Sequence, residues 1–179
     1  MRQPRGMPRR PGPSGFIGGA FAVALFVSTY PFKVDKKGRV SVPAPFRKAV
    51  EGEPFDGVYC FPSLHRPCIQ GGGHSYIEMV RRAIEQEFDP LTDDQDNFAF
   101  ALLGNATPLG FDGDGRVTLT QPLMAAAGIG DAAVFVGLGA YFEIWQPAAF
   151  EERMAAAREH ASANRARLAR PRGADGGAA

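Results

Sequence analysis

Cysteine is scarce in this 179-residue chain, and no apolar run is long enough to cross a bilayer. The two cysteines, Cys60 and Cys68, argue against a secreted scaffold held together by disulfides and favour a reducing compartment. Residues 16–27 form an apolar stretch behind an arginine pair, as in a secretory signal, but no small-residue cleavage site follows them. We therefore expect a cytoplasmic protein with no membrane partner.

Motifs that would carry catalysis or bind a metal are missing as well. Cys60, His65, Cys68 and His74 are the nearest approach to a zinc site, and their spacing matches no familiar ligand pair. The glycines at residues 71–73 lack the Lys-Ser/Thr that completes a phosphate-binding loop. No Ser/His/Asp arrangement is evident either. We expect no metal, no cofactor and no enzymatic activity.

The small net charge of +1 conceals charges that are separated along the chain. Residues 23–52 hold six basic side chains against two acidic ones, and the tail after residue 157 is rich in arginine. Residues 78–96 are acidic. Separated faces of opposite sign indicate an anionic partner for the basic face, head-to-tail self-association, or both.

A short sequence motif occurs twice in the chain. Residues 35–40 read DKKGRV, and residues 112–117, which lie 77 positions later, read DGDGRV. The surrounding apolar positions also correspond: Phe32, Val34, Val40, Val42, Phe46 and Val50 match Leu109, Phe111, Val117, Leu119, Leu123 and Ala127. A duplication of this kind indicates two units that bury their apolar faces together.

Each copy predicts the same succession of elements. The first copy predicts strands at 26–34 and 39–42, a helix at 45–51, strands at 58–61 and 67–70, and a longer helix. The second predicts a short helix after Thr120, strands at 133–137 and 141–145, and a helix from Pro147. Gly38 and Gly115 suit the left-handed position of a hairpin turn, and Ser75 with Glu78 forms a capping box. The pattern predicts an α+β fold of two pseudo-symmetric ββαββα repeats.

Three motifs, in the expected order, resemble the MraZ family of the AbrB-like swapped-hairpin superfamily. They are FVSTY at residues 26–30, DKKGRVSVPA at residues 35–44 and GLGAYFEIW at residues 137–145. The resemblance covers roughly residues 24–158 and implies a β-rich double-split (swapped-hairpin) barrel. Since MraZ proteins usually begin close to the first motif, it also implies that synthesis starts near Val23.

The expected division of the chain follows from these patterns. It comprises a disordered N-terminal extension at 1–22, the first AbrB-like repeat with its helix at 23–88, a connecting segment at 89–104, the second repeat with its helix at 105–158 and a basic, frayed or disordered tail at 159–179.

The resemblance implies a sequence-specific DNA-binding transcriptional regulator of the cell division and cell wall gene cluster. Such proteins bind short direct repeats of double-stranded DNA in their own promoter region. They assemble into ring-like homo-oligomers and act in the cytoplasm, on the nucleoid.

The first repeated turn carries the residues best suited to DNA. The family's Asp-x-x-x-Arg pair falls on Asp35 and Arg39. Arginine suits bidentate recognition of guanine, whereas lysine neutralises phosphate as a point charge. We therefore assign Arg39 to base reading, Lys33, Lys36 and Lys37 to phosphate contacts, and Asp35 to shaping the turn and holding the guanidinium.

The second turn repeats the pair as Asp112 and Arg116 but carries Gly113 and Asp114 in place of the two lysines. Arg116 either contacts DNA or bridges to a carboxylate. Arg47, in the first short helix, completes the set of candidate DNA-binding residues. We expect the first turn to supply most of the DNA affinity and the second to be mainly structural.

Two other kinds of protein fit parts of the pattern. An AbrB-like antitoxin or interaction module would use the same turn, although such proteins carry one repeat and a partner-wrapping tail. A Cys-dependent or zinc-dependent enzyme would use Cys60 or Cys68. The duplication argues against the first alternative, and the missing ligand spacing argues against zinc.

Overall fold

The computed structural model describes residues 25–167. The expectations for the N-terminal extension, for a start near Val23 and for the last residues of the tail lie outside these residues. The strands are β1 (Thr29–Lys33), β2 (Arg39–Ser41), β3 (Gly57–Pro62), β4 (Cys68–Gly72), β5 (Thr107–Gly110), β6 (Arg116–Thr118), β7 (Ala132–Gly137) and β8 (Phe142–Trp145). The helices are α1 (Ala44–Ala49), α2 (His74–Glu87), α3 (Asp93–Phe98), the π-helix η1 (Ala99–Leu103), α4 (Gln121–Ala127), α5 (Pro147–Ala163) and the 3-10 turn η2 (Arg165–Arg167).

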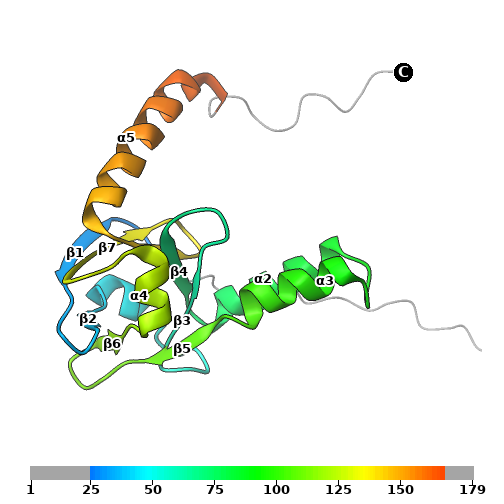
Figure 1. Cartoon of the computed structure of the whole chain (residues 1–179), viewed down its shortest axis with the longest axis horizontal. Helices are drawn as coiled ribbons and strands as arrows, with labels where there is room; N and C mark the ends of the chain where they lie inside the picture. The colour runs from blue at the N-terminus through cyan, green and yellow to red at the C-terminus, as the bar shows by residue number, and fades with distance from the viewer. Residues whose placement is uncertain (1–24, 168–179) are drawn as a thin grey trace, which may run out of the picture.

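The α+β class and the two ββαββα units are confirmed. The first unit runs from β1 to α2 and the second from β5 to α5, with α3 and η1 between them. Figure 1 shows α2 with α3 on one side of the strands and α5 rising from another. Within residues 25–167, no helix has the length and apolar character needed to span a bilayer.

The first two strands of each repeat pair mainly with the other repeat, which corrects the hairpin expected between them, whereas the later hairpins β3–β4 and β7–β8 form within their own repeats as expected. One sheet has the order β1-β7-β8-β4-β3-β5, and β2 pairs with β6 in a separate two-stranded ribbon. Every pairing is antiparallel. Strands β1 and β2 meet only in a single bridge between Val34 and Val40. The first two strands of each repeat therefore pair with strands of the other repeat, as in a swapped-hairpin fold.

One core unites the two repeats. Ten of the twelve repeated apolar positions are buried, and the remaining two, Phe32 and Phe111, pack partly buried against the same cluster. Phe46 of α1 lies at the centre of an aromatic group, with ring centroids 5.1 Å from Phe26 and 5.4 Å from Phe142. The duplication thus has the physical meaning expected of it, because neither copy could bury these side chains alone.

The outer face of the sheet holds a buried carboxylate that the sequence did not reveal. Glu143 is 2% exposed and accepts a hydrogen bond of 2.9 Å from Nε1 of Trp145. Its other carboxylate oxygen lies 3.5 Å from Nη1 of Arg66, on the turn between β3 and β4. Phe150 of α5 packs against Trp145 in a smaller apolar cluster beside it. The pair ties the two repeats together, since Arg66 belongs to the first and Glu143 to the second.

The predicted capping box of Ser75 and Glu78 is wrong. The N-cap of helix α2 is Gly73, two residues before Ser75, and the backbone N–H and hydroxyl of Ser75 donate to Glu53 at 3.1 and 2.8 Å. Glu78 instead pairs with Arg81 at 3.0 Å. A carboxylate from the preceding loop therefore satisfies the helix start, where unpaired N–H groups favour negative charge.

Helix α4 follows its predicted boundaries. Thr120 is the N-cap, although its hydroxyl makes no capping hydrogen bond, and a proline lies in the first turn. Gly128 ends the helix in the left-handed conformation with φ of 61°. Glycine adopts this conformation without steric cost, which explains why the helix ends there.

Replacing Glu53 by alanine is expected to lower the free energy of unfolding by about 0.5–2 kcal/mol, the usual cost of losing a helix cap. Glu78→Ala is the matched control, because it removes a carboxylate from the same helix start but only a surface ion pair, worth about 0–1 kcal/mol. Urea denaturation of both variants measures the difference. A larger loss in Glu78→Ala would contradict the assignment of the cap.

Candidate nucleic-acid interface

The first repeated turn is closed by its own aspartate. One oxygen of Asp35 accepts hydrogen bonds from the backbone N–H groups of Lys37, at 2.8 Å, and Arg39, at 2.9 Å. The other oxygen accepts from Nε of Arg39 at 2.7 Å. Gly38 takes a φ of +78°, as the turn requires. The aspartate thus shapes the loop and orients the guanidinium at the same time.

These contacts depend on the ionised carboxylate. The backbone hydrogen bond from Arg39, followed by its side-chain hydrogen bond, lowers the pKa of Asp35 from its ordinary value. The contribution of Asp35 to the folded turn is therefore complete at neutral pH. It is lost as the pH falls through the folded-state pKa.

The second turn has the same geometry. Asp112 accepts from the backbone N–H groups of Asp114 and Arg116 and from Nε of Arg116, each at 2.9 Å. Gly115 takes a φ of +72°. Hydrogen bonding from Arg116 lowers the pKa of Asp112 in the same way. The two copies of the motif are therefore equivalent in their backbone and in the first contact of each arginine.

Each turn is anchored on the opposite repeat. The backbone N–H of Leu119 donates to the carbonyl of Gly38 at 2.9 Å, and that of Val42 donates to the carbonyl of Gly115 at 3.1 Å. A Cβ atom on Gly38 would lie 2.6 Å from the carbonyl oxygen of Leu119, so this approach admits only glycine. The ribbon β2–β6 carries both turns at the side of the molecule away from α2 and α3 (Figure 1).

The side chains on the two turns differ in charge and in pairing. Lys36 and Lys37 are exposed at the tip of the first turn, and exposed Lys33 precedes it at the end of β1. In the second turn, a carboxylate oxygen of Asp114 lies 2.5 Å from Nη2 of Arg116. The carboxylate bridge considered for Arg116 is therefore present, and it forms within the turn itself.

Arg47, in α1 of the first repeat, contacts the turn of the second repeat. Its guanidinium packs against the second turn, where a Cβ atom on Gly115 would lie 1.4 Å from Nη1 of Arg47. Met124 occupies the equivalent place in the other repeat, with its sulfur 3.4 Å from the Cβ position on Gly38. The structure thus joins Asp35 to Arg39 in the first turn but places Arg47 with the second turn.

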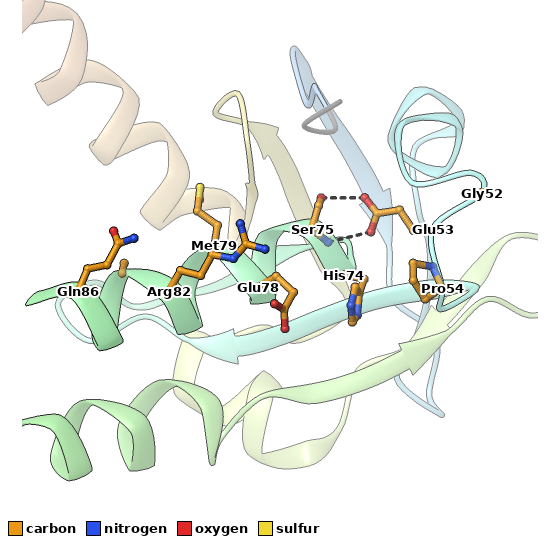
Figure 2. Close-up of a pocket in the computed structure, with 10 residues that line it drawn as sticks. Gly52, Glu53, Pro54, His74, Ser75, Glu78, Met79, Arg82 and Gln86 are labelled. Carbon is orange, nitrogen blue, oxygen red and sulfur yellow. Dashed lines mark hydrogen bonds between the residues drawn. The ribbon is translucent and has the colours of Figure 1, made fainter. Parts of the chain in front are cut away.

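A cleft of about 680 Å³ lies elsewhere, between α2 and the loop at residues 52–54. Figure 2 shows Ser75 bonded to Glu53 in this cleft, with His74 beside them. The hydroxyl of Ser75 therefore donates to a helix-capping carboxylate, not to an imidazole. This pairing serves the start of α2 and does not form a nucleophile with its base.

The two cysteines lack the properties of reactive thiols. Both are buried, and burial raises the pKa of Cys60 and of Cys68 to about 12, with the negative charge of Glu143 adding to the effect at Cys68. A thiol is nucleophilic as its thiolate, which these values suppress at neutral pH. Among residues 25–167, no three His, Cys, Asp or Glu side chains are grouped so that they could hold a metal ion.

Comparison with known proteins identifies relatives over most of the chain. A family model described as "MraZ protein, putative antitoxin-like" matches residues 102–170. The Transcriptional regulator MraZ of Rickettsia akari (strain Hartford) is 46% identical over 141 residues, which cover 79% of this chain and 94% of the relative. The protein of the same name from Rickettsia africae (strain ESF-5) is 46% identical over 144 residues, covering 80% and 96%. That of Rickettsia bellii (strain OSU 85-389) is 45% identical over 135 residues, covering 75% and 89%.

Proposed function

The chain belongs to the MraZ family of transcriptional regulators, which are not enzymes, and we propose on this basis that it binds promoter DNA through its first Asp-x-x-Gly-Arg turn. The target is double-stranded DNA with short direct repeats, in the protein's own promoter region at the head of the cell division and cell wall gene cluster. The protein acts in the cytoplasm, on the nucleoid.

The observation that carries this proposal is the oriented guanidinium of Arg39 beside two exposed lysines. Asp35 holds Arg39 through Nε, and the two Nη groups make no ion pair among the described residues. Guanine offers O6 and N7 as a pair of acceptors in the major groove, which a two-stranded β-ribbon can enter. Lys36 and Lys37 would meet the flanking phosphates, where neutralisation of charge supplies most non-specific affinity.

Self-association forms part of the proposal. A ring-like homo-oligomer would display several first turns, so repeated DNA boxes would be bound with a gain from multivalency. Sedimentation of the purified protein would test this, since a monomer at every concentration would contradict it.

Binding to the protein's own upstream region tests the function directly. We expect fluorescence anisotropy to give tighter binding to a duplex from this region than to a duplex of the same composition in scrambled order. Specific sites commonly exceed non-specific ones by about 10³-fold or more. Equal affinity for the two duplexes would refute sequence-specific recognition.

Replacing Lys36 by alanine is expected to weaken binding to all sequences alike and to reduce the salt slope of the affinity by about one. The reason is that a phosphate contact carries no base information. Lys48→Ala is the matched control, because Lys48 bears the same charge on α1 but is paired with Glu51. An unchanged slope in Lys36→Ala would contradict a phosphate contact by this lysine.

A further inference from the structure

The two repeated arginines differ in what their outer nitrogen atoms contact. Arg39 makes one ion pair among the described residues, through Nε to Asp35 at 2.7 Å. Arg116 makes the equivalent pair with Asp112 at 2.9 Å and a second one, through Nη2 to Asp114 at 2.5 Å. The sequence shows that Asp114 replaces a lysine of the first turn, but not that its carboxylate reaches the guanidinium.

This second contact occupies one of the two Nη groups with which the guanidinium of Arg116 would bind DNA. A guanidinium bonded through Nε to its own turn can still present both Nη groups to a guanine or a phosphate. In Arg116, one of these groups is already occupied by a carboxylate. That carboxylate also carries the same sign of charge as the phosphates it would face.

The net charges of the two turns also favour DNA binding at the first turn over the second. Residues 35–39 carry a net charge of +2, whereas residues 112–116 carry −1, and the guanidinium of Arg47, which packs against Gly115, brings the second turn only to zero. The pKa of Arg116 is raised first by the hydrogen bond that its side chain donates to Asp112, then by the charges of Asp112 and Asp114, and last by the negative charge of Asp35. The ribbon β2–β6 joins the two turns through only three residue pairs, from Arg39 with Thr118 to Ser41 with Arg116, so a DNA duplex bound at the first turn would lie close to the second.

We propose that Asp114 masks Arg116 from DNA: its carboxylate occupies the guanidinium and so prevents it from contacting a base or a phosphate. The second turn then keeps the geometry of the first but contributes little to DNA binding. This inference rests on the proposed DNA-binding function. Asp114 acts as a positioning residue, because it works through the guanidinium of Arg116. Its side chain is 71% exposed, so its removal disturbs no packing, and its backbone N–H can still donate to Asp112.

Asp114→Asn tests the proposal, because it keeps the shape of the side chain and removes its charge. We expect the variant to bind the upstream duplex at least fivefold more tightly and with a salt slope steeper by about one, as for one added contact. Arg116→Ala alone should leave the affinity within about twofold of the wild type, since the masked arginine contributes little.

The double variant Asp114→Asn with Arg116→Ala separates masking from general electrostatics. If Asp114 acts through Arg116, the gain disappears in the double variant, and the coupling between the two positions shows this directly. A gain that persists without Arg116, no gain in Asp114→Asn, or a tenfold loss in Arg116→Ala would each overturn the proposal. Failure of the wild type to bind the upstream duplex would refute the proposed function itself, and the inference with it.

Discussion

Replacing Phe46 by alanine should lower the free energy of unfolding by about 3–5 kcal/mol, the usual cost of truncating a buried phenylalanine. Phe46 is fully buried in the single core shared by the two repeats. Its ring lies edge-on to Phe26 at 5.1 Å and to Tyr30 at 5.5 Å, and it also meets Phe135 and Phe142. Removing it opens a cavity whose rigid aromatic walls cannot collapse inward, so the loss falls in the upper part of the range.

Urea denaturation of the variant measures this loss. Leu123→Ala is the matched control, because Leu123 occupies the equivalent position in the second repeat and is 2% exposed. It should also destabilise the protein, by about 2–5 kcal/mol, and less than Phe46→Ala because fewer atoms are removed. A change of only about 0.5 kcal/mol for Phe46→Ala, typical of surface positions, would contradict the central place of this ring.

Replacing Arg39 by alanine should weaken binding to the upstream duplex by about 1–3 kcal/mol and relax the base preference at one position. The effect is expected because the guanidinium is held ready for contact by Asp35 and its Nη groups have no carboxylate partner among the described residues. Affinities for duplexes that vary one base pair at a time would measure both changes.

Arg39→Lys separates the charge of this side chain from its shape. Lysine keeps the positive charge but lacks the planar fork, so it cannot replace a bidentate contact. We expect this variant to retain binding to scrambled DNA while losing preference for the upstream duplex. Wild-type discrimination in Arg39→Lys would show that Arg39 supplies charge only.

The sequence pattern predicted the elements of the fold and the hairpins β3–β4 and β7–β8, but not the pairing of the first two strands of each repeat, which only the resemblance to the swapped-hairpin superfamily implied. The apolar positions recur in the same register in both copies, which suffices to predict two equivalent ββαββα units. The same alternation is satisfied whether β1 pairs within its own repeat or with β7 of the other, so the pattern alone cannot choose. The capping of α2 was missed for a similar reason, because Glu53 is 22 residues away from Ser75.

In the candidate site too, contacts between residues close in sequence could be predicted, whereas contacts between distant residues could not. The turn geometry of Asp35 and Gly38 could be predicted because it depends on a few neighbouring residues. The packing of Arg47 on Gly115 depends on the exchange of strands and could not. Glu143 was missed because a glutamate in a strand is ordinarily placed at the surface, and only its contacts with Trp145 and Arg66 account for its burial.

The most direct test of the central claim is a titration of the upstream duplex with the wild-type protein, Arg39→Ala and Arg116→Ala under one salt condition. The two arginines occupy equivalent positions in turns of equal geometry, so the variants form a matched pair. We predict that Arg39→Ala loses most of the affinity and that Arg116→Ala keeps it. Loss of binding in Arg116→Ala with full binding in Arg39→Ala would contradict the assignment of the first turn as the reader of DNA.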